Sequence, residues 1–244
     1  MPSDGAKSQT FQPKASMAHT SRLPTSAQVE IHPKLEQCVK AHLSKPWQQP
    51  IHAHTQAAFE KVHKQLSQTP KPIVLDSGCG TGWASVELAK RYPDHWVVGV
   101  DRSIDRLSRA PTLPANVYLI RAELGDFWRL IRQASWPVAT HYVLYPNPYP
   151  KARHLKRRWH GHPVWPDLLT VGERLVMRTN AQVYALEWAQ ALNLCQQKNV
   201  DHRELNCDEV RRHPLSAFEK KYAASGHALF EVTSQRPDLP SPRA

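Results

Sequence analysis

Hydrophobic positions along the chain alternate between helix-like and strand-like patterns. Leu35, Val39 and Leu43 recur every four positions, and residues 54–66 carry a second apolar stripe, so both segments are expected to be helices. Further helices are expected at residues 83–89, 103–110, 127–131 and 183–195. Short apolar runs predict strands at residues 73–77, 96–101, 117–120, 140–145 and 174–177, with weaker candidates at 200–205 and 228–232. This alternation predicts an α/β fold with a mainly parallel sheet and helices on both faces.

Composition divides the chain into four stretches. Residues 1–28 are rich in Ser, Thr, Lys, Gln and Pro without apolar periodicity, which predicts a disordered arm, with an organelle transit peptide as the alternative. Residues 29–70 are expected to form a helical N-terminal cap, and residues 71–236 the α/β domain. Residues 237–244 are expected to be a flexible tail.

A glycine-rich loop follows the first predicted strand. Gly78, Gly80 and Gly82 allow a sharp turn and a close approach of the backbone to a ligand. The N–H groups at the start of the next helix favour an anionic or polar ligand. The spacing Gly-x-Gly-x-Gly differs from the Gly-x-Gly-x-x-Gly of dinucleotide binders. Asp101 ends the second strand, where a carboxylate can accept hydrogen bonds from two ribose hydroxyls.

Four polar residues stand at or just after the ends of predicted strands. They are Asp76, Asp101, Glu123 and Asn147. Ligands of parallel sheets bind outside the carboxyl ends of the strands, so these side chains are expected to line one rim.

Charge points to a polyanionic partner. Among 244 residues, 32 are Lys or Arg and 21 are Asp or Glu, a formal charge of +11, which favours nucleic acid or an anionic membrane surface. Five of the positive charges fall between Lys151 and Arg158, and no acid occurs in residues 141–166. Such a run contacts phosphates, and Tyr149, Trp159 and Trp165 could stack on unpaired bases. The alternative is a solvated charged loop.

Several classes of protein are disfavoured. The four cysteines have no C-x-x-C spacing, so neither a disulfide framework nor a zinc cluster is indicated, and a cytoplasmic location is expected. No apolar run approaches the roughly 20 residues of a membrane span, and no secretory signal is evident. His52 and His54 are interpreted as solvated side chains rather than metal ligands, and no metal is expected. Monomer and homodimer both stay open.

The strand, the Asp-Ser-Gly-Cys-Gly-Thr-Gly loop at residues 76–82, the helix and the strand ending in Asp101 together resemble class I S-adenosylmethionine-dependent methyltransferases. A generic strand-turn-helix of another α/β protein is the alternative. The resemblance implies a Rossmann-like, seven-stranded sheet and S-adenosyl-L-methionine as cofactor.

The basic segment resembles a narrower family, the bacterial tRNA (guanine-N7-)-methyltransferases, over roughly residues 72–236. That family has Asp-Pro-Trp-Pro-Lys where this chain has Asn147-Pro-Tyr-Pro-Lys151, followed by Arg-His and Lys-Arg-Arg. Arg178-Thr-Asn180 is similar to its Thr-Asp step, and Ser216-Ala-Phe-Glu219 to its closing Thr-x-Phe/Tyr-Glu motif. The implied cofactor residues are Asp76, Gly78, Gly80, Gly82, Asp101, Glu123 and Asn147. The implied tRNA-binding residues are Lys151, Arg153, Lys156, Arg157, Arg158, Asn180, Ser216, Phe218 and Glu219.

The resemblance implies methylation of tRNA at N7 of the variable-loop guanine, position 46, with Asn147 orienting the base in catalysis. Asn147 and Asn180 both stand where the family has Asp, which puts the rate and the target in question. Asn147-Pro148-Tyr149 is also similar to the Asn-Pro-Pro-Tyr motif of amino-group methyltransferases, so amino-group methylation of nucleic acid stays open. A non-catalytic RNA-binding relative and a small-molecule methyltransferase stay open as well, and the net charge disfavours the last.

Overall fold

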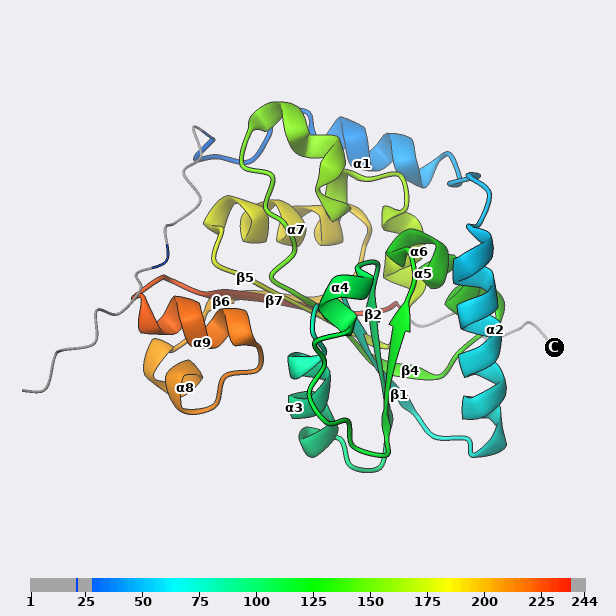
Figure 1. The fold of residues 1–244 in the computed structure, drawn as a ribbon. Helices are drawn as coiled ribbons and strands as arrows, with labels where there is room; N and C mark the ends of the chain where they lie inside the picture. The colour runs from blue at the N-terminus through cyan, green and yellow to red at the C-terminus, as the bar shows by residue number, and fades with distance from the viewer. Residues whose placement is uncertain (1–20, 22–27, 238–244) are drawn as a thin grey trace, which may run out of the picture.

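The computed structural model describes Ser21 and residues 28–237. The expected arm at 1–28 and tail at 237–244 therefore lie outside the described residues, apart from Ser21, Gln28 and Pro237. The centre is a seven-stranded sheet in the order β3-β2-β1-β4-β5-β7-β6 (Figure 1). The strands are β1 (Ile73–Ser77), β2 (Trp96–Asp101), β3 (Val117–Arg121), β4 (Val138–Leu144), β5 (Arg174–Thr179), β6 (Lys198–Glu204) and β7 (Phe230–Gln235).

The sheet is parallel from β3 through β5, and β7 runs antiparallel to both β5 and β6. All five residues of β1 are buried, because helices cover both faces of the sheet centre. The edge strand β6 is exposed along most of its length and is rich in polar residues. The predicted α/β fold with a mainly parallel sheet is confirmed.

Two layers of helices enclose the sheet. The helices are α1 (Leu35–Leu43), α2 (Ala53–Gln68), α3 (Trp83–Arg91), α4 (Ile104–Leu107), α5 (Leu124–Gln133), α6 (Trp165–Thr170), α7 (Gln182–Leu194), α8 (Cys207–Arg212) and α9 (Ala217–Ala224). The main hydrophobic core joins one face of the sheet to α1, α2, α5, α6 and α7. On the other face, α3 packs on a second cluster, and α8 and α9 share a third (Figure 1).

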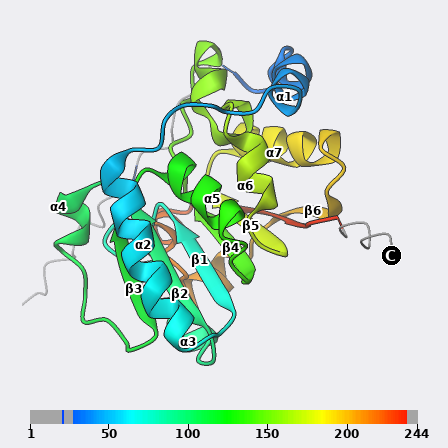
Figure 2. The ribbon, with the colours of Figure 1, turned by 90° about the vertical axis from the view of Figure 1, so that its right-hand side faces the viewer.

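Residues 29–70 do not form a separate cap. Leu35 and Val39 of α1 are fully buried in the main core, together with Phe59 and Val62 of α2. The ring of Phe59 stacks on that of Trp136 with centroids 4.8 Å apart. Figure 2 shows α2 lying along the sheet layer beside α5 rather than over the sheet's end. The expected cap is corrected accordingly: Leu35, Val39, Phe59 and Val62 complete the core of the α/β domain, whereas Leu43 is 46% exposed.

Short helices account for most other differences from the predicted elements. The helix expected at 103–110 ends at Leu107, although the Ser103 side chain caps it by accepting from Arg106 N–H. The basic segment, expected as a loop, forms two 3-10 helices, η1 (Ala152–Arg157) and η2 (Trp159–Gly161). Helices α6, α8 and α9 were not predicted, because six to eight residues carry too little periodicity. Within the described residues, no helix, long or short, has the length and apolarity that crossing a bilayer requires.

Candidate active site

The glycine-rich loop between β1 and α3 closes around the end of β2. Gly78 donates its N–H to the β2 backbone at 2.8 Å, and Gly80 donates to Asp101 Oδ2 at 3.0 Å. Gly82 has φ +77°, and a Cβ there would lie 2.4 Å from Leu119 Cδ1. Only glycine fits this position without a shift of its neighbours.

A cavity of about 700 Å³ opens at the carboxyl ends of β1, β2 and β4. Its size falls within the roughly 300–1,000 Å³ of small-molecule sites. Among the predicted site residues, it brings together Gly78, Asp101, Glu123, Asn147, Lys156 and Arg157. The expected shared rim therefore forms around three of the four strand-end residues, and Asp76 is the exception.

Asp101 holds the loop and still has capacity for a ligand. Its carboxylate is 2% exposed; Oδ2 accepts from Gly80, while Oδ1 accepts from Ser103 N–H at 2.8 Å and pairs with Arg106 at 3.0 Å. Two carboxylate oxygens offer about four acceptor positions, so one remains on Oδ2. Arg106 comes from the short helix α4 and is 44% exposed, so a ligand hydroxyl can replace it on Oδ1.

Glu123 faces the cavity from the start of α5. Its backbone N–H donates to Thr55 Oγ1 at 3.1 Å, which ties this position to α2. One turn later, Asp126 accepts from His52 N and Nδ1 at 2.9 and 2.6 Å. The hydrogen bond and charge of Asp126 raise the pKa of His52. This end of the cavity is therefore rich in acceptors and carries one cation that depends on pH.

The segment after β4 forms a constrained turn around Asn147. Tyr145 and Tyr149 have φ values of +52° and +43°, which bulky L-residues rarely adopt. Asn147 Oδ1 accepts from Tyr149 N–H at 3.2 Å. Because an N–H needs an oxygen acceptor, this bond fixes which way the amide points and leaves Nδ2 as the donor for another group. Asn147 is exposed and lines the cavity.

A buried ion pair anchors this turn to α7. Arg158 donates from Nε and Nη2 to the Tyr149 carbonyl at 3.3 and 3.1 Å, and its Nη1 pairs with Glu187. Glu187 also accepts from His160 Nε2 at 2.8 Å and from His32 N–H at 2.9 Å. Burial by itself raises the pKa of Glu187, but the bonds and charges of His160 and Arg158 lower it to about 2. Burial lowers the pKa of His160, although the hydrogen bond to Glu187 and the charge of Glu187 act in the opposite direction.

The basic segment therefore divides into exposed and buried charges. Lys151, Arg153, Lys156 and Arg157 are exposed, as phosphate-binding side chains must be. Arg158 is only 2% exposed and is committed to Glu187 and the Tyr149 carbonyl. The expectation that Arg158 contacts phosphate is corrected: its charge serves the internal ion pair.

The closing motif at residues 216–219 is mostly structural. The side chain of Ser216 caps α9 by accepting from Glu219 N–H. Glu219 is fully buried, pairs with Arg178 at 3.0 Å and accepts from the Leu215 N–H at 2.6 Å. Neither side chain reaches the surface, which corrects their expected contact with tRNA. Phe218 is 50% exposed and can still contact a substrate.

Asn180 follows β5 and is half-buried. Its Nδ2 lies 3.2 Å from His227 Nδ1, within hydrogen-bond distance. It does not line the main cavity. The structure therefore separates Asn180 from Asn147, and the two Asn residues that replace the family's Asp occupy different surroundings.

Asp76 lies behind the loop rather than in the cavity. It is 1% exposed, and its Oδ2 accepts from Ser85 Oγ at 2.7 Å. Burial raises the pKa of Asp76 to about 6, with a further contribution from the charge of Asp101. Asp76, Gly80 and Gly82 all lie outside the lining of the cavity, so cofactor contact by these three residues stays a prediction.

The order of strands, with antiparallel β7 between β5 and β6, and a ligand cavity beside the glycine loop define a class I methyltransferase fold. The family model described as "Putative methyltransferase" matches residues 70–232. The chain belongs to this methyltransferase family.

Curated relatives carry a more specific name. A tRNA (guanine-N(7)-)-methyltransferase of Mycolicibacterium gilvum is 30% identical over 186 residues, covering 68% of this chain and 67% of that protein. One of Geobacillus thermodenitrificans is 25% identical over 190 residues, covering 71% and 83%. Among solved structures, the 16S rRNA methyltransferase KamB matches with a TM-score of 0.54 at 18% identity, covering 78% of this chain and 96% of that one. A structure described as an antibiotic-related methyltransferase gives 0.52 at 16% identity, covering 79% and 97%. Both structures support the fold.

Several cavity residues were not predicted from sequence. They are Trp47, Gln49, His52, Arg102, Arg106 and His162. Arg102 directly follows the predicted acid at the end of β2, and Arg106 comes five residues after that acid, so their position gave a usable signal. Trp47, Gln49 and His52 come from the connection between α1 and α2, whose path depends on tertiary packing. No cluster of three or more potential metal ligands occurs in the described part of the chain.

Proposed function

We propose that this chain is an S-adenosylmethionine-dependent tRNA methyltransferase whose target is N7 of the variable-loop guanine. One observation carries the proposal: the cavity joins Asp101 and Glu123 to Asn147, and Lys156 and Arg157 line its margin. The names of the curated relatives support guanine N7 and tRNA as the target. A cytoplasmic location belongs to the same proposal.

The residues present fit the cofactor. S-adenosyl-L-methionine, when bound, supplies a methyl group on a sulfonium centre. Asp101 retains acceptor capacity for ribose hydroxyls, and Glu123 offers a carboxylate on the adenine side. Gly78 lines the cavity, and a Cβ there would meet only Leu124 Cδ1 at 4.0 Å, so its bare backbone gives room for the methionine end.

The chemistry asks more for positioning than for proton transfer. Guanine N7 has a free lone pair, so no side chain need remove a proton before attack. Asn147, held by Tyr149 N–H, presents Nδ2 as a donor and can bind guanine O6 beside the reacting N7. Such fixed orientation supplies much of the rate in transfer reactions. Because Asn is neutral, it favours the cationic product less than an Asp would.

The test of the proposal is methyl transfer from labelled S-adenosylmethionine to unmodified tRNA, with the product identified by nucleoside mass spectrometry. We expect 7-methylguanosine. Asp101→Ala should abolish cofactor binding in calorimetry, whereas Asp94→Ala, at an exposed acid outside the cavity, should leave it unchanged. Unchanged cofactor affinity in Asp101→Ala would remove the assignment of that acid.

A second candidate, amino-group methylation of nucleic acid, is favoured by Asn147 and Tyr149 standing together in the cavity lining. The methyl-transfer assay distinguishes the two candidates, because amino-group methylation would yield a methylated nucleoside other than 7-methylguanosine. A non-catalytic relative would instead bind tRNA without any thermal shift on addition of S-adenosylmethionine.

A further inference from the structure

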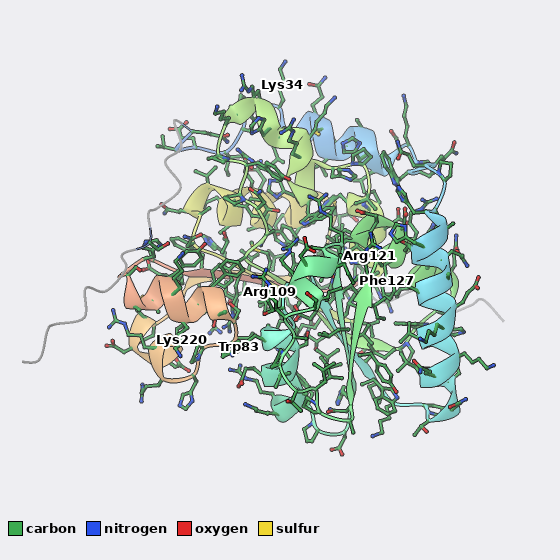
Figure 3. The ribbon with its side chains drawn as sticks, in the orientation of Figure 1. Lys34, Trp83, Arg109, Arg121, Phe127 and Lys220 are labelled. Carbon is green, nitrogen blue, oxygen red and sulfur yellow. The ribbon has the colours of Figure 1, made fainter. Side chains whose placement is uncertain are left out.

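A second cavity lies between α1 and η1, outside the candidate active site. It has a volume of about 590 Å³. Lys34, Gln37 and His42 line one wall, from the start and the inner side of α1, and Arg153 and Lys156 line the other, from η1. We call this cavity the α1–η1 groove. Figure 1 shows the α1 ribbon beside the segment that contains η1 at the top of the molecule, and Figure 3 labels Lys34 there.

The groove is positively charged and has no acid in its lining. Lys34, Arg153 and Lys156 are exposed, and none of the three side chains forms an ion pair or hydrogen bond with another described residue. The acid of α1, Glu36, pairs with Lys40 at 2.5 Å, and neither of these two lines the groove. Three unneutralised cations in one concavity favour an extended anion.

The groove adjoins the candidate active site. Lys156 lines both cavities, and Arg157 lines the active-site cavity beside it. A strand whose base enters the active-site cavity can therefore continue along η1 into the groove. This shared wall distinguishes the α1–η1 groove from an isolated patch of surface lysines.

The walls of the groove are held in place. Cys38 Sγ and His42 Nε2 both donate to the Gly161 carbonyl, at 3.4 and 3.1 Å, which fixes α1 against η2. His32 N–H donates to Glu187, the carboxylate that also holds Arg158 after η1. Both walls are thus tied to the same buried ion pair, and the groove needs little rearrangement to bind.

We propose that the α1–η1 groove binds the phosphodiester backbone of RNA that flanks the target nucleotide. This inference rests on the proposed function, since it assigns RNA to the main cavity. Lys34, Arg153 and Lys156 contact phosphates and contribute affinity and register rather than base recognition.

The test uses the full chain and compares two double variants of equal charge change. Lys34→Ser/Arg153→Gln removes two groove charges, and Ser is a favourable residue at the N-cap position that Lys34 occupies, so α1 is retained. The control, Lys40→Gln/Lys64→Gln, removes two exposed charges outside the groove. The affinity for unmodified tRNA is measured as a function of salt concentration, and thermal melting checks that both variants fold.

The logarithm of the affinity falls linearly with the logarithm of the salt concentration. We expect this line to be less steep for the groove variant, its slope being smaller in magnitude by about 2, one for each phosphate that the variant no longer binds. The loss of affinity relative to the native chain then grows about fourfold for each twofold dilution of salt. The control should change the slope by much less. Equal slopes in both variants would overturn the proposal while leaving the main function intact, whereas a native chain that binds no tRNA would overturn both.

Cys38, which lines the groove and is partly exposed, gives an independent readout. Bound tRNA should slow alkylation of Cys38 and leave Cys195, a partly exposed cysteine at the far end of α7, unaffected. Protection by inorganic phosphate but not by tRNA would assign the groove to a small anion and overturn the proposal.

Discussion

The buried Arg158–Glu187 pair gives the sharpest quantitative prediction. Glu187→Gln keeps the shape of the side chain but removes the charge that faces Arg158. The guanidinium stays 2% exposed, and no other carboxylate of the described residues pairs with it. Breaking a buried pair in this way costs about 3–5 kcal/mol, because one charge is left in a poorly solvated site.

The pKa of Glu187 gives a second route to the magnitude. Burial raises this pKa, but the hydrogen bonds and charges of His160 and Arg158 outweigh burial and lower it from 4.5 to about 2. A difference of about 2.5 pKa units corresponds to about 3 kcal/mol of stability. Because the folded-state pKa is depressed, this contribution is present above about pH 4.5 and is lost as the pH falls toward 2. The two routes agree.

The assay is denaturant-induced unfolding at pH 7, with a matched control on the surface. Glu36→Gln removes the partner of Lys40 in a pair whose side chains are 54% and 63% exposed, and should cost at most about 1 kcal/mol. Arg158→Gln/Glu187→Gln removes both buried charges. Its cost should fall below the sum of the single variants by about 1–3 kcal/mol, since neither charge is then left unpaired.

The same variant should also slow methyl transfer, because Arg158 holds the Tyr149 carbonyl beside Asn147. The reasoning is refuted if Glu187→Gln costs no more than Glu36→Gln. It is also refuted if the double variant equals the sum of its singles, since the two charges would then be independent.

Three further predictions concern the loop and the turn. Asn147→Asp keeps the bond to Tyr149 N–H but replaces the donor that faces guanine O6 with an acceptor, so 7-methylguanosine formation should slow, with the activation free energy higher by about 1–3 kcal/mol; a faster reaction would show that the charge of the carboxylate on the cationic product outweighs the lost hydrogen bond. Asp76→Asn should raise the free energy of unfolding by about 3 kcal/mol at pH 8 and not at pH 3, because burial raises the native pKa from 3.8 to about 6, so the destabilisation by this carboxyl group builds up between those two pH values and is complete above them; equal gains at both pH values would contradict this. Gly99→Ala would place a Cβ 2.5 Å from Ser85 Oγ and should cost about 1–3 kcal/mol in the same unfolding assay, where an unchanged midpoint would show that the neighbours yield.

The sequence predicted what depends on local pattern. Apolar runs of four to six residues located the central strands, and the polar residues at their ends located the rim, because parallel strands bring their carboxyl ends to one edge. Asp101, Glu123 and Asn147 meet in the cavity for this reason. Trp47, Gln49 and His52 of the α1–α2 connection could not be predicted, because the apolar pattern of a helix does not show which part of the sheet the helix covers.

Burial of charge was the larger failure of prediction. Arg158 ends a run of exposed cations and has no local feature that separates it from Arg157. Its partner Glu187 lies 29 residues later, on α7, and the two side chains come together only when the chain folds. Glu219 is similar: a motif expected to contact substrate is, in this chain, turned inward onto Arg178. Long-range pairing decides both cases.

The two buried pairs explain how the turn around Asn147 keeps its strained backbone. Positive φ at a bulky residue costs of order 1–3 kcal/mol, and Tyr145 and Tyr149 both have it. Tyr149 is held by Arg158, and Tyr145 donates its N–H to the Arg178 carbonyl at 2.7 Å.

Arg178, in turn, pairs with Glu219 at 3.0 Å and with Glu231 at 2.7 Å. Each end of the turn therefore depends on an arginine whose acid comes from a distant element. A loss of activity in Glu219→Gln would consequently report on the position of Asn147 and not on a contact with tRNA. Phe218→Ala, which leaves that pair intact and removes an exposed ring from the same helix, is the variant that isolates the substrate contact.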